Sequence, residues 1–113
     1  MRAFDADTLG VGPVLQSTPF AQVIAAAIME DNDDVIVSDR GGYLRVFAPR
    51  VCRLSRATVE AATGSPVRFP GELEVIMSSF AGQMRLTEHG AVWWLAGEST
   101  PDPPAPPPHD AVR

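Results

Sequence analysis

The sequence predicts a single small α+β domain with a mostly antiparallel sheet and helices packed on it. The chain has 113 residues, which suits one domain with one hydrophobic core. Segments with helical spacing of apolar residues occur among short segments with strand-like alternation. Tight turns such as Arg40-Gly41-Gly42 join neighbouring strands, and such turns make antiparallel pairs. The expected order of elements is approximately β-α-β-β-β-α-α-β-β.

The first elements are a short extended segment and a helix, both within residues 11–31. Thr18 suits the N-cap of the helix. Pro19 suits its first position, because proline lacks the N–H that would be unpaired there. Acidic residues in "EDNDD" oppose the helix dipole and favour an end there. One helical face carries the apolar side chains of Phe20, Val23, Ile24, Ala27 and Ile28.

Three strands are expected in residues 34–54. The run 35–37 is apolar throughout, which predicts a buried strand. Pro49 ends the second strand before residues 51–54 form the third. In the second strand, one face is predicted to carry Tyr43, Arg45 and Phe47, and the other Leu44 and Val46.

Two further helices and a hairpin are expected in the second half. Ser55 suits the N-cap of one helix, and Gly64 suits the position after its end. Pro70 opens the next helix. Residues 81–87 are predicted to form a strand that pairs with 91–95. The stripe of the third helix follows i, i+3, i+4, i+7 spacing at Leu73, Ile76, Met77 and Phe80.

Residues 11–97 are thus predicted to form the domain, after a flexible arm (1–10) and before a disordered tail (98–113). The tail region from residue 99 onward holds six of the eleven prolines. The N-terminus lacks the apolar centre of a signal peptide. No apolar run reaches the roughly 18 residues that a membrane span needs. We therefore expect a cytoplasmic protein that does not bind membranes.

The charged residues exclude a nucleic-acid-binding role. The net charge is −5, and all nine basic residues are arginines scattered along the chain. The single cysteine, Cys52, can form neither an internal disulfide nor a cysteine-based metal site. Its position within an apolar strand predicts a buried, inert thiol.

The residues also predict no catalytic chemistry, no cofactor and no metal. Of the two histidines, His109 lies in the tail and His89 in a predicted turn. No cluster offers the four ligands of a zinc site, and the acidic run 30–34 lacks the spacing of a calcium loop. Ser78 or Ser79 could form a triad only with His89, which is expected at the far end of a strand. The protein is therefore expected to act by binding.

Two stretches are candidates for binding. Trp93 and Trp94 are adjacent in a strand and point to opposite faces, so one enters the core and the other lies under a helix or at the surface. Ser78, Ser79 and Phe80 lie in the last turn of the predicted third helix, at its junction with the next strand, where they form either a binding surface or an ordinary helix end. In the second interpretation, Phe80 is the last core residue and Gly82 marks a bulge.

Four segments in order resemble one protein family. They are "VGPV", "IVSDRGGYLRV", "TVEAATGSPVRFPGELEV" and "SSFAGQ". Within the second, Asp39, Arg40 and Tyr43 match a Val-x-Asp-basic-x-x-aromatic pattern. Over about residues 11–95, the chain is similar to the effector proteins of bacterial multicomponent soluble diiron monooxygenases. These are also called coupling or regulatory proteins, and their systems oxidise methane, phenol, toluene and alkenes.

The resemblance implies a regulatory subunit without a cofactor, monomeric when free, that is not itself an enzyme. Such a protein binds the diiron hydroxylase of its system and tunes O2 activation, substrate access and coupling. The short N-terminal arm favours alkene or aromatic oxidation. Small side chains at the contact would let two backbones approach closely. The implied hydroxylase interface is Ile76, Ser78, Ser79, Phe80, Ala81, Gly82 and Gln83.

Two competing functions remain open from the residues. One is a regulatory domain that binds a small ligand, with a pocket covered by the sheet that carries Trp93 and Trp94. The other is an enzyme without a cofactor, which the small number of histidines disfavours.

Overall fold

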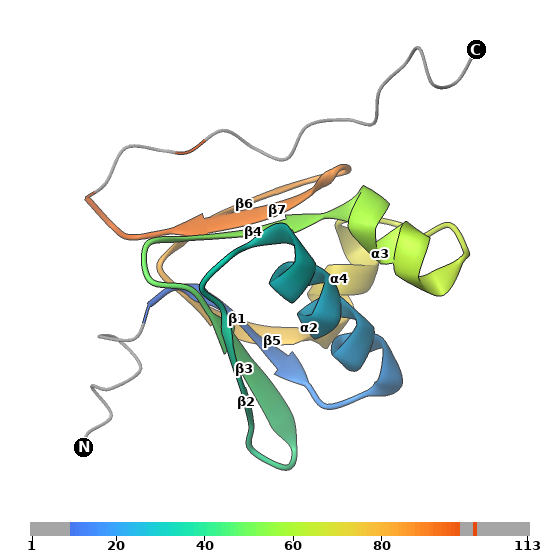
Figure 1. The fold of residues 1–113 in the computed structure, drawn as a ribbon, viewed down its shortest axis with the longest axis horizontal. Coiled ribbons are helices and arrows are strands. Elements are labelled where there is room, and N and C mark those ends of the chain that lie inside the picture. The colour runs from blue at the N-terminus through green and yellow to red at the C-terminus, as the bar shows by residue number, and fades with distance from the viewer. Residues whose placement is uncertain (1–9, 98–100, 102–113) are drawn as a thin grey trace.

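The computed structural model describes residues 10–97 and 101, and the described part contains seven strands and three helices. In chain order they are β1 (Gly12–Gln16), α2 (Pro19–Asp31), β2 (Ile36–Asp39), β3 (Tyr43–Phe47), β4 (Val51–Ser55), α3 (Arg56–Thr63), α4 (Gly71–Ile76), β5 (Met77–Ala81), β6 (Gln83–Thr87) and β7 (Gly90–Trp94) (Figure 1). The predicted α+β class is confirmed, with one strand more than expected. Apart from residues 10 and 101, the predicted arm and the tail beyond residue 97 lie outside the described residues.

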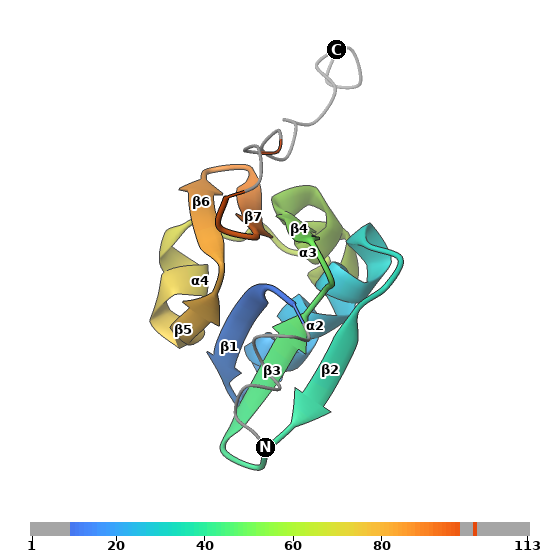
Figure 2. The ribbon, with the colours of Figure 1, turned by 90° about the vertical axis from the view of Figure 1, so that its left-hand side faces the viewer.

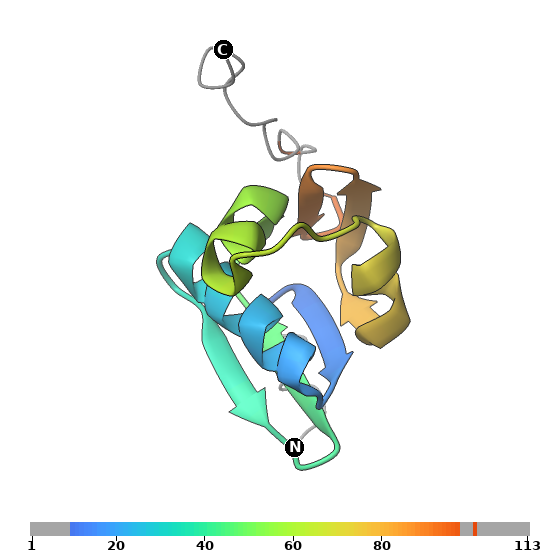
Figure 3. The ribbon, with the colours of Figure 1, turned by 90° about the vertical axis from the view of Figure 1, so that its right-hand side faces the viewer.

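The strands form two antiparallel sheets. One has four strands in the order β2-β3-β1-β5, and the other has three in the order β4-β7-β6. The two sheets diverge, and α2 lies in the angle between them (Figures 1 and 2). Figure 3 shows that α3 lies beside α2, on the side of the molecule where the helices pack. The core therefore lies between the sheets and α2, and the opposite face of the four-stranded sheet is left uncovered by helices. Within the described residues, no helix is long and apolar enough to cross a membrane.

Helix α2 begins as the sequence predicts. The Thr18 side-chain oxygen accepts a hydrogen bond from the Ala21 N–H at 3.0 Å. The helix ends at Asp31, and the side chain of the next residue forms hydrogen bonds at this end. The Asn32 side-chain amide donates to the carbonyls of Ile28 and Arg53, each at 2.7 Å. The end of α2 is therefore tied to β4.

Asp31 connects α2 to the start of α3. Ser55 is the N-cap of α3 by position, as predicted, but its side chain makes no capping hydrogen bond. The Asp31 carboxylate instead accepts from the Ser55 N–H and from the Thr58 hydroxyl, each at 2.7 Å. A carboxylate at a helix N-terminus also interacts favourably with the helix dipole. At the other end, Gly64 has a φ of 74° and caps α3 as predicted.

The prediction for residues 35–37 was wrong about burial. Ile36 is 53% exposed, because β2 is an edge strand and its side chain lies on the uncovered face. In β3, by contrast, Leu44 and Val46 are buried and Tyr43 is exposed, as the alternation predicts.

The prediction that the third helix continues to Phe80 was also wrong. Helix α4 ends at Ile76, and the next five residues form β5. Leu73 and Ile76 are buried as expected, whereas Phe80 is 42% exposed. Strand β5 pairs antiparallel with β1, so a tertiary pairing overrides the local helical pattern. Only Gly82 separates β5 from β6, and it lies where the chain passes from one sheet to the other.

Both tryptophans are covered. They lie on β7, the central strand of the three-stranded sheet, and pair across it with β4 and β6. Trp93 is 0% exposed and Trp94 is 8% exposed. The predicted hairpin of β6 and β7 is confirmed. Since both indole rings are part of the packed interior, they form no open wall for the ligand pocket considered from the sequence.

Candidate functional site

A shallow hollow of about 580 Å³ lies on the uncovered face of the four-stranded sheet. Strand alternation creates this face. Leu15 and Leu44 point into the core, so their neighbours in β1 and β3 point outward. The residues lining the hollow are Val14, Gln16, Gly42, Tyr43, Arg45, Ser78, Ser79, Phe80 and Ala81.

The register of the strands sets the arrangement of these side chains. Val14 lies opposite Arg45 on one side and Ser79 on the other. Gln16 lies opposite Tyr43. Residues from three separate parts of the chain are therefore brought onto one surface.

A β-bulge places two consecutive serines on this surface. Ser79 pairs with Val14, but Leu15 pairs with Met77, so Ser78 is the extra residue. The Ser78 hydroxyl donates to the Val14 carbonyl at 3.3 Å. In a regular strand, neighbouring side chains would point to opposite faces. Because of the bulge, both serines are exposed and both line the hollow.

The sheet also carries exposed apolar side chains. In the described part of the chain, five large apolar side chains are exposed: Met29, Ile36, Tyr43, Val75 and Phe80. Three of them, Ile36, Tyr43 and Phe80, lie on strands of the four-stranded sheet, and the last two line the hollow. Exposed apolar groups gathered on one face are typical of a surface that binds another protein.

One charge lies in the hollow. Arg45 is the only charged residue among those lining it. The guanidinium carbon of Arg45 lies 5.8 Å from the centroid of the Phe47 ring, a distance at which the ring face attracts a cation.

The seven predicted interface residues fall into three groups. Ser78, Ser79, Phe80 and Ala81 lie together on β5 and line the hollow. Gln83 is exposed but belongs to β6, in the other sheet. The third group is Ile76 and Gly82, which lie at the two ends of β5. Ile76 is 7% exposed and belongs to the core, so it offers a partner little surface.

Gly82 is small for a reason within the fold. Its φ is +94°, a conformation that side chains other than glycine rarely adopt. A Cβ at this position would lie 2.5 Å from the Trp94 carbonyl oxygen and 2.7 Å from Cγ1 of Val11. The absence of a side chain at Gly82 therefore serves the passage between sheets, whatever its role at an interface.

The other half of the hollow consists of residues that the sequence patterns do not mark as a binding surface. The missed residues are Val14, Gln16, Gly42, Tyr43 and Arg45. The alternation of Tyr43 and Arg45 with buried neighbours was the signal that placed them on an outer face. Their proximity to the serines depends on the pairing of β1 with both β3 and β5, which local patterns do not specify.

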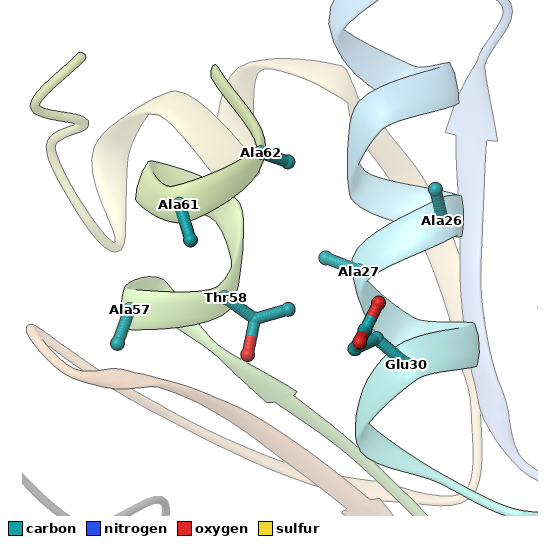
Figure 4. A pocket seen from close by; sticks show the side chains of 7 residues that line it. All are labelled: Ala26, Ala27, Glu30, Ala57, Thr58, Ala61 and Ala62. Atoms are coloured by element: carbon teal, nitrogen blue, oxygen red, sulfur yellow. The ribbon is translucent and has the colours of Figure 1, made fainter. Parts of the chain in front are cut away.

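A second hollow of about 480 Å³ lies between α2 and α3 (Figure 4). Its lining consists of Ala26, Ala27, Glu30, Ala57, Thr58, Ala61 and Ala62. These side chains are mostly single methyl groups, with one carboxylate and one hydroxyl that already donates to Asp31. The lining therefore offers no nucleophile paired with a base.

The groups considered for catalysis are not assembled into a site. His89 lies in the turn after β6, with its Nε2 atom 3.6 Å from Oε2 of Glu88, whereas the serines lie on β5 before that strand begins. Burial raises the pKa of the Cys52 thiol to about 12, and the negative charge of Asp31 adds to the rise. The predicted buried thiol is confirmed, and it stays protonated at neutral pH. Among the described residues, no group of three or more histidines, cysteines and carboxylates is placed to hold a metal ion.

Comparisons with known proteins agree with a binding role. Residues 10–94 match the model of the MmoB/DmpM family. Over 92 residues, the chain is 36% identical to the "Alkene monooxygenase system, effector subunit" of Xanthobacter autotrophicus (strain ATCC BAA-1158 / Py2), which covers 80% of this chain and 90% of the relative. A chain from the structure of a phenol hydroxylase–regulatory protein complex superimposes with a TM-score of 0.68 at 24% identity, covering 74% of this chain and 95% of the other. The last similarity supports the fold.

Proposed function

The chain belongs to the MmoB/DmpM family, and from this premise we propose that it is the effector subunit of a multicomponent monooxygenase system. The family match spans nearly all of the described domain, and this observation carries the proposal. The relative from Xanthobacter autotrophicus is an effector subunit too, and the match extends over most of its length. The chain is thus a regulatory, non-catalytic component, as its resemblance to the effector proteins implied.

The proposed partner is the diiron hydroxylase of the same system, and the proposed contact surface is the uncovered face of the four-stranded sheet. Phe80 and Tyr43 supply exposed aromatic area, the type of side chain that contributes most to protein interfaces. Ser78, Ser79 and Ala81 are small, so the backbone of a partner can approach β5 closely. Exposed aromatic side chains beside a surface of small side chains suit docking against a helix of the hydroxylase.

The proposed mechanism is a shift between two hydroxylase conformations. The effector binds one conformation more tightly and so raises its population. Its influence is limited by that difference in affinity, and a tenfold change in the ratio requires about 1.4 kcal/mol. The favoured conformation is the one in which the hydroxylase activates O2 and admits substrate. The hydroxylase carries out the iron chemistry, and the effector determines how large a fraction of the hydroxylase is in the competent conformation.

The substrate class and compartment are further parts of the proposal. Alkenes or aromatic compounds are the proposed substrates, because the relative belongs to an alkene monooxygenase system. The cytoplasm is the proposed compartment, in keeping with a single reduced and buried thiol at Cys52. The free protein is proposed to be a monomer.

Titration of the hydroxylase with this protein tests the proposed function. With reductase and substrate present, turnover and the yield of product per O2 consumed should rise until about one effector is bound per hydroxylase active site. The protein alone should show no turnover. An unrelated acidic protein at the same concentrations is the control. A flat response across the whole titration would refute the role of effector.

A further inference from the structure

We propose that the hydroxylase places a carboxylate in the hollow, where it pairs with Arg45 and fixes the orientation of docking. The inference rests on the proposed function, because it names a contact within the same interface. It concerns Arg45, the one charged side chain lining the hollow, and the chemical group of the hydroxylase that would bind to it.

The charge of the hollow is opposite to that of the whole protein. The chain has 14 acidic and 9 basic residues, with a net charge of −5. None of the nine residues lining the hollow is acidic, and Arg45 is the only charged one. The hollow is therefore a locally positive spot on an acidic molecule, and complementary charge on a partner would be negative.

Arg45 has no carboxylate partner within the described part of the chain. Its guanidinium carbon lies 5.8 Å from the centroid of the Phe47 ring. Arg56 provides a contrast, since it approaches the Glu60 carboxylate at 3.7 Å and donates to the Glu88 carbonyl at 3.1 Å. The guanidinium of Arg45 therefore retains N–H donors that the described residues do not use.

Docking would make a partner for Arg45 necessary. Arg45 is half-buried on β3, with Val14 opposite it on β1 and Ser38 opposite it on β2. A protein that covers this face would remove the remaining water from the guanidinium, and an unpaired buried charge is strongly unfavourable. A carboxylate is the matching group, because its two oxygens accept two parallel N–H donors of arginine.

The surroundings of Arg45 also suit a carboxylate. Ser79 and Tyr43 carry hydroxyl groups in the same hollow, and these can donate to oxygen lone pairs that Arg45 leaves free. A partner with a neutral or basic group at this position would leave Arg45 unpaired. The pair would thus select the cognate hydroxylase against surfaces of the wrong charge.

Three variants test the pair by measuring the Kd for the hydroxylase at low and high salt. Arg45→Met should raise the Kd about 30-fold and reduce its dependence on salt, because the charge is lost. Arg45→Lys should retain the salt dependence and raise the Kd less, about fivefold, because the charge remains and the two-pronged geometry is lost. Arg85→Met, which changes an exposed arginine on β6, is the matched control and should bind within twofold of the wild type.

The outcomes separate this inference from the proposed function. If the wild type binds the hydroxylase and folded Arg45→Met binds equally well, the proposed pairing of Arg45 with a hydroxylase carboxylate is wrong. The proposed effector function is unaffected by this result. If the wild type itself does not bind, the proposed function fails. Circular dichroism verifies the fold of each variant. Should Arg45→Met not fold, Arg45→Lys decides, and wild-type affinity of this variant would overturn the inference.

Discussion

Replacing Ser79 by tryptophan is expected to weaken both binding to the hydroxylase and stimulation of turnover by about 100-fold or more, a loss typical of hot-spot positions. Ser79 is exposed on β5 and lines the hollow opposite Val14. An indole at this position would occupy the space that a partner needs for close approach. The free protein should stay folded, because substitutions at exposed positions usually change stability by about 0.5 kcal/mol or less. Titration of hydroxylase turnover with the variant measures the effect.

Ser65→Trp is the matched control for this substitution. Ser65 is an exposed serine in the connection between α3 and α4, outside the residues that line the hollow. This variant should stimulate the hydroxylase like the wild type. Full stimulation by Ser79→Trp would place the contact surface elsewhere on the molecule.

Replacing Gly82 by alanine is expected to lower the free energy of unfolding by about 3–5 kcal/mol, a loss typical of strained or overpacked sites. Two costs combine at this position. The φ of +94° is unfavourable for alanine, and the added Cβ would lie 2.5 Å from the Trp94 carbonyl oxygen. The neighbouring backbone belongs to β7, so it cannot move without disturbing the sheet. Urea unfolding measured by tryptophan fluorescence gives the change.

Gly41→Ala separates the two costs. Gly41 has a φ of +90°, close to that of Gly82, but a Cβ there would meet no atom within 4 Å. This variant should lose only about 1–2 kcal/mol, the cost of the backbone conformation. Equal losses for the two variants would show that the contact with β7 is unimportant. If only the Gly82 variant loses this much stability, reduced activation of the hydroxylase by Gly82 variants is explained first by damage to the fold. It is then no direct evidence that Gly82 contacts the hydroxylase.

The sequence predicts those elements whose causes lie within a few residues. Thr18 accepts the hydrogen bond expected of an N-cap, and Gly64 adopts the left-handed conformation expected after a helix. The turn at Arg40-Gly41-Gly42 joins β2 and β3 as expected. In each case, neighbouring residues and the backbone conformation they favour determine the structure.

The remaining features depend on residues far apart in the chain. Met77 and Phe80 fit a helical stripe, and only the pairing of β5 with β1 makes this segment a strand. Ile36 and Val37 are both apolar and adjacent on edge strand β2, yet Val37 packs against the core and Ile36 is exposed on the other face, which depends on how the sheet packs. About half of the candidate surface, the stretch "SSFA", could thus be predicted from the sequence. Its other half, including Arg45, depends on the register of β1 with β3.

Amide hydrogen exchange in this protein, measured with and without its hydroxylase, tests most directly whether the uncovered sheet face is the contact surface. Contact through this face predicts slower exchange in β5 (Met77–Ala81) and in the neighbouring turn at Gly41 and Gly42 when the hydroxylase is bound. Exchange in α3 (Arg56–Thr63), on the helical side, should stay unchanged. In a complex shown to be saturated, slower exchange confined to α2 and α3, with β5 unaffected, would contradict contact through the uncovered sheet face.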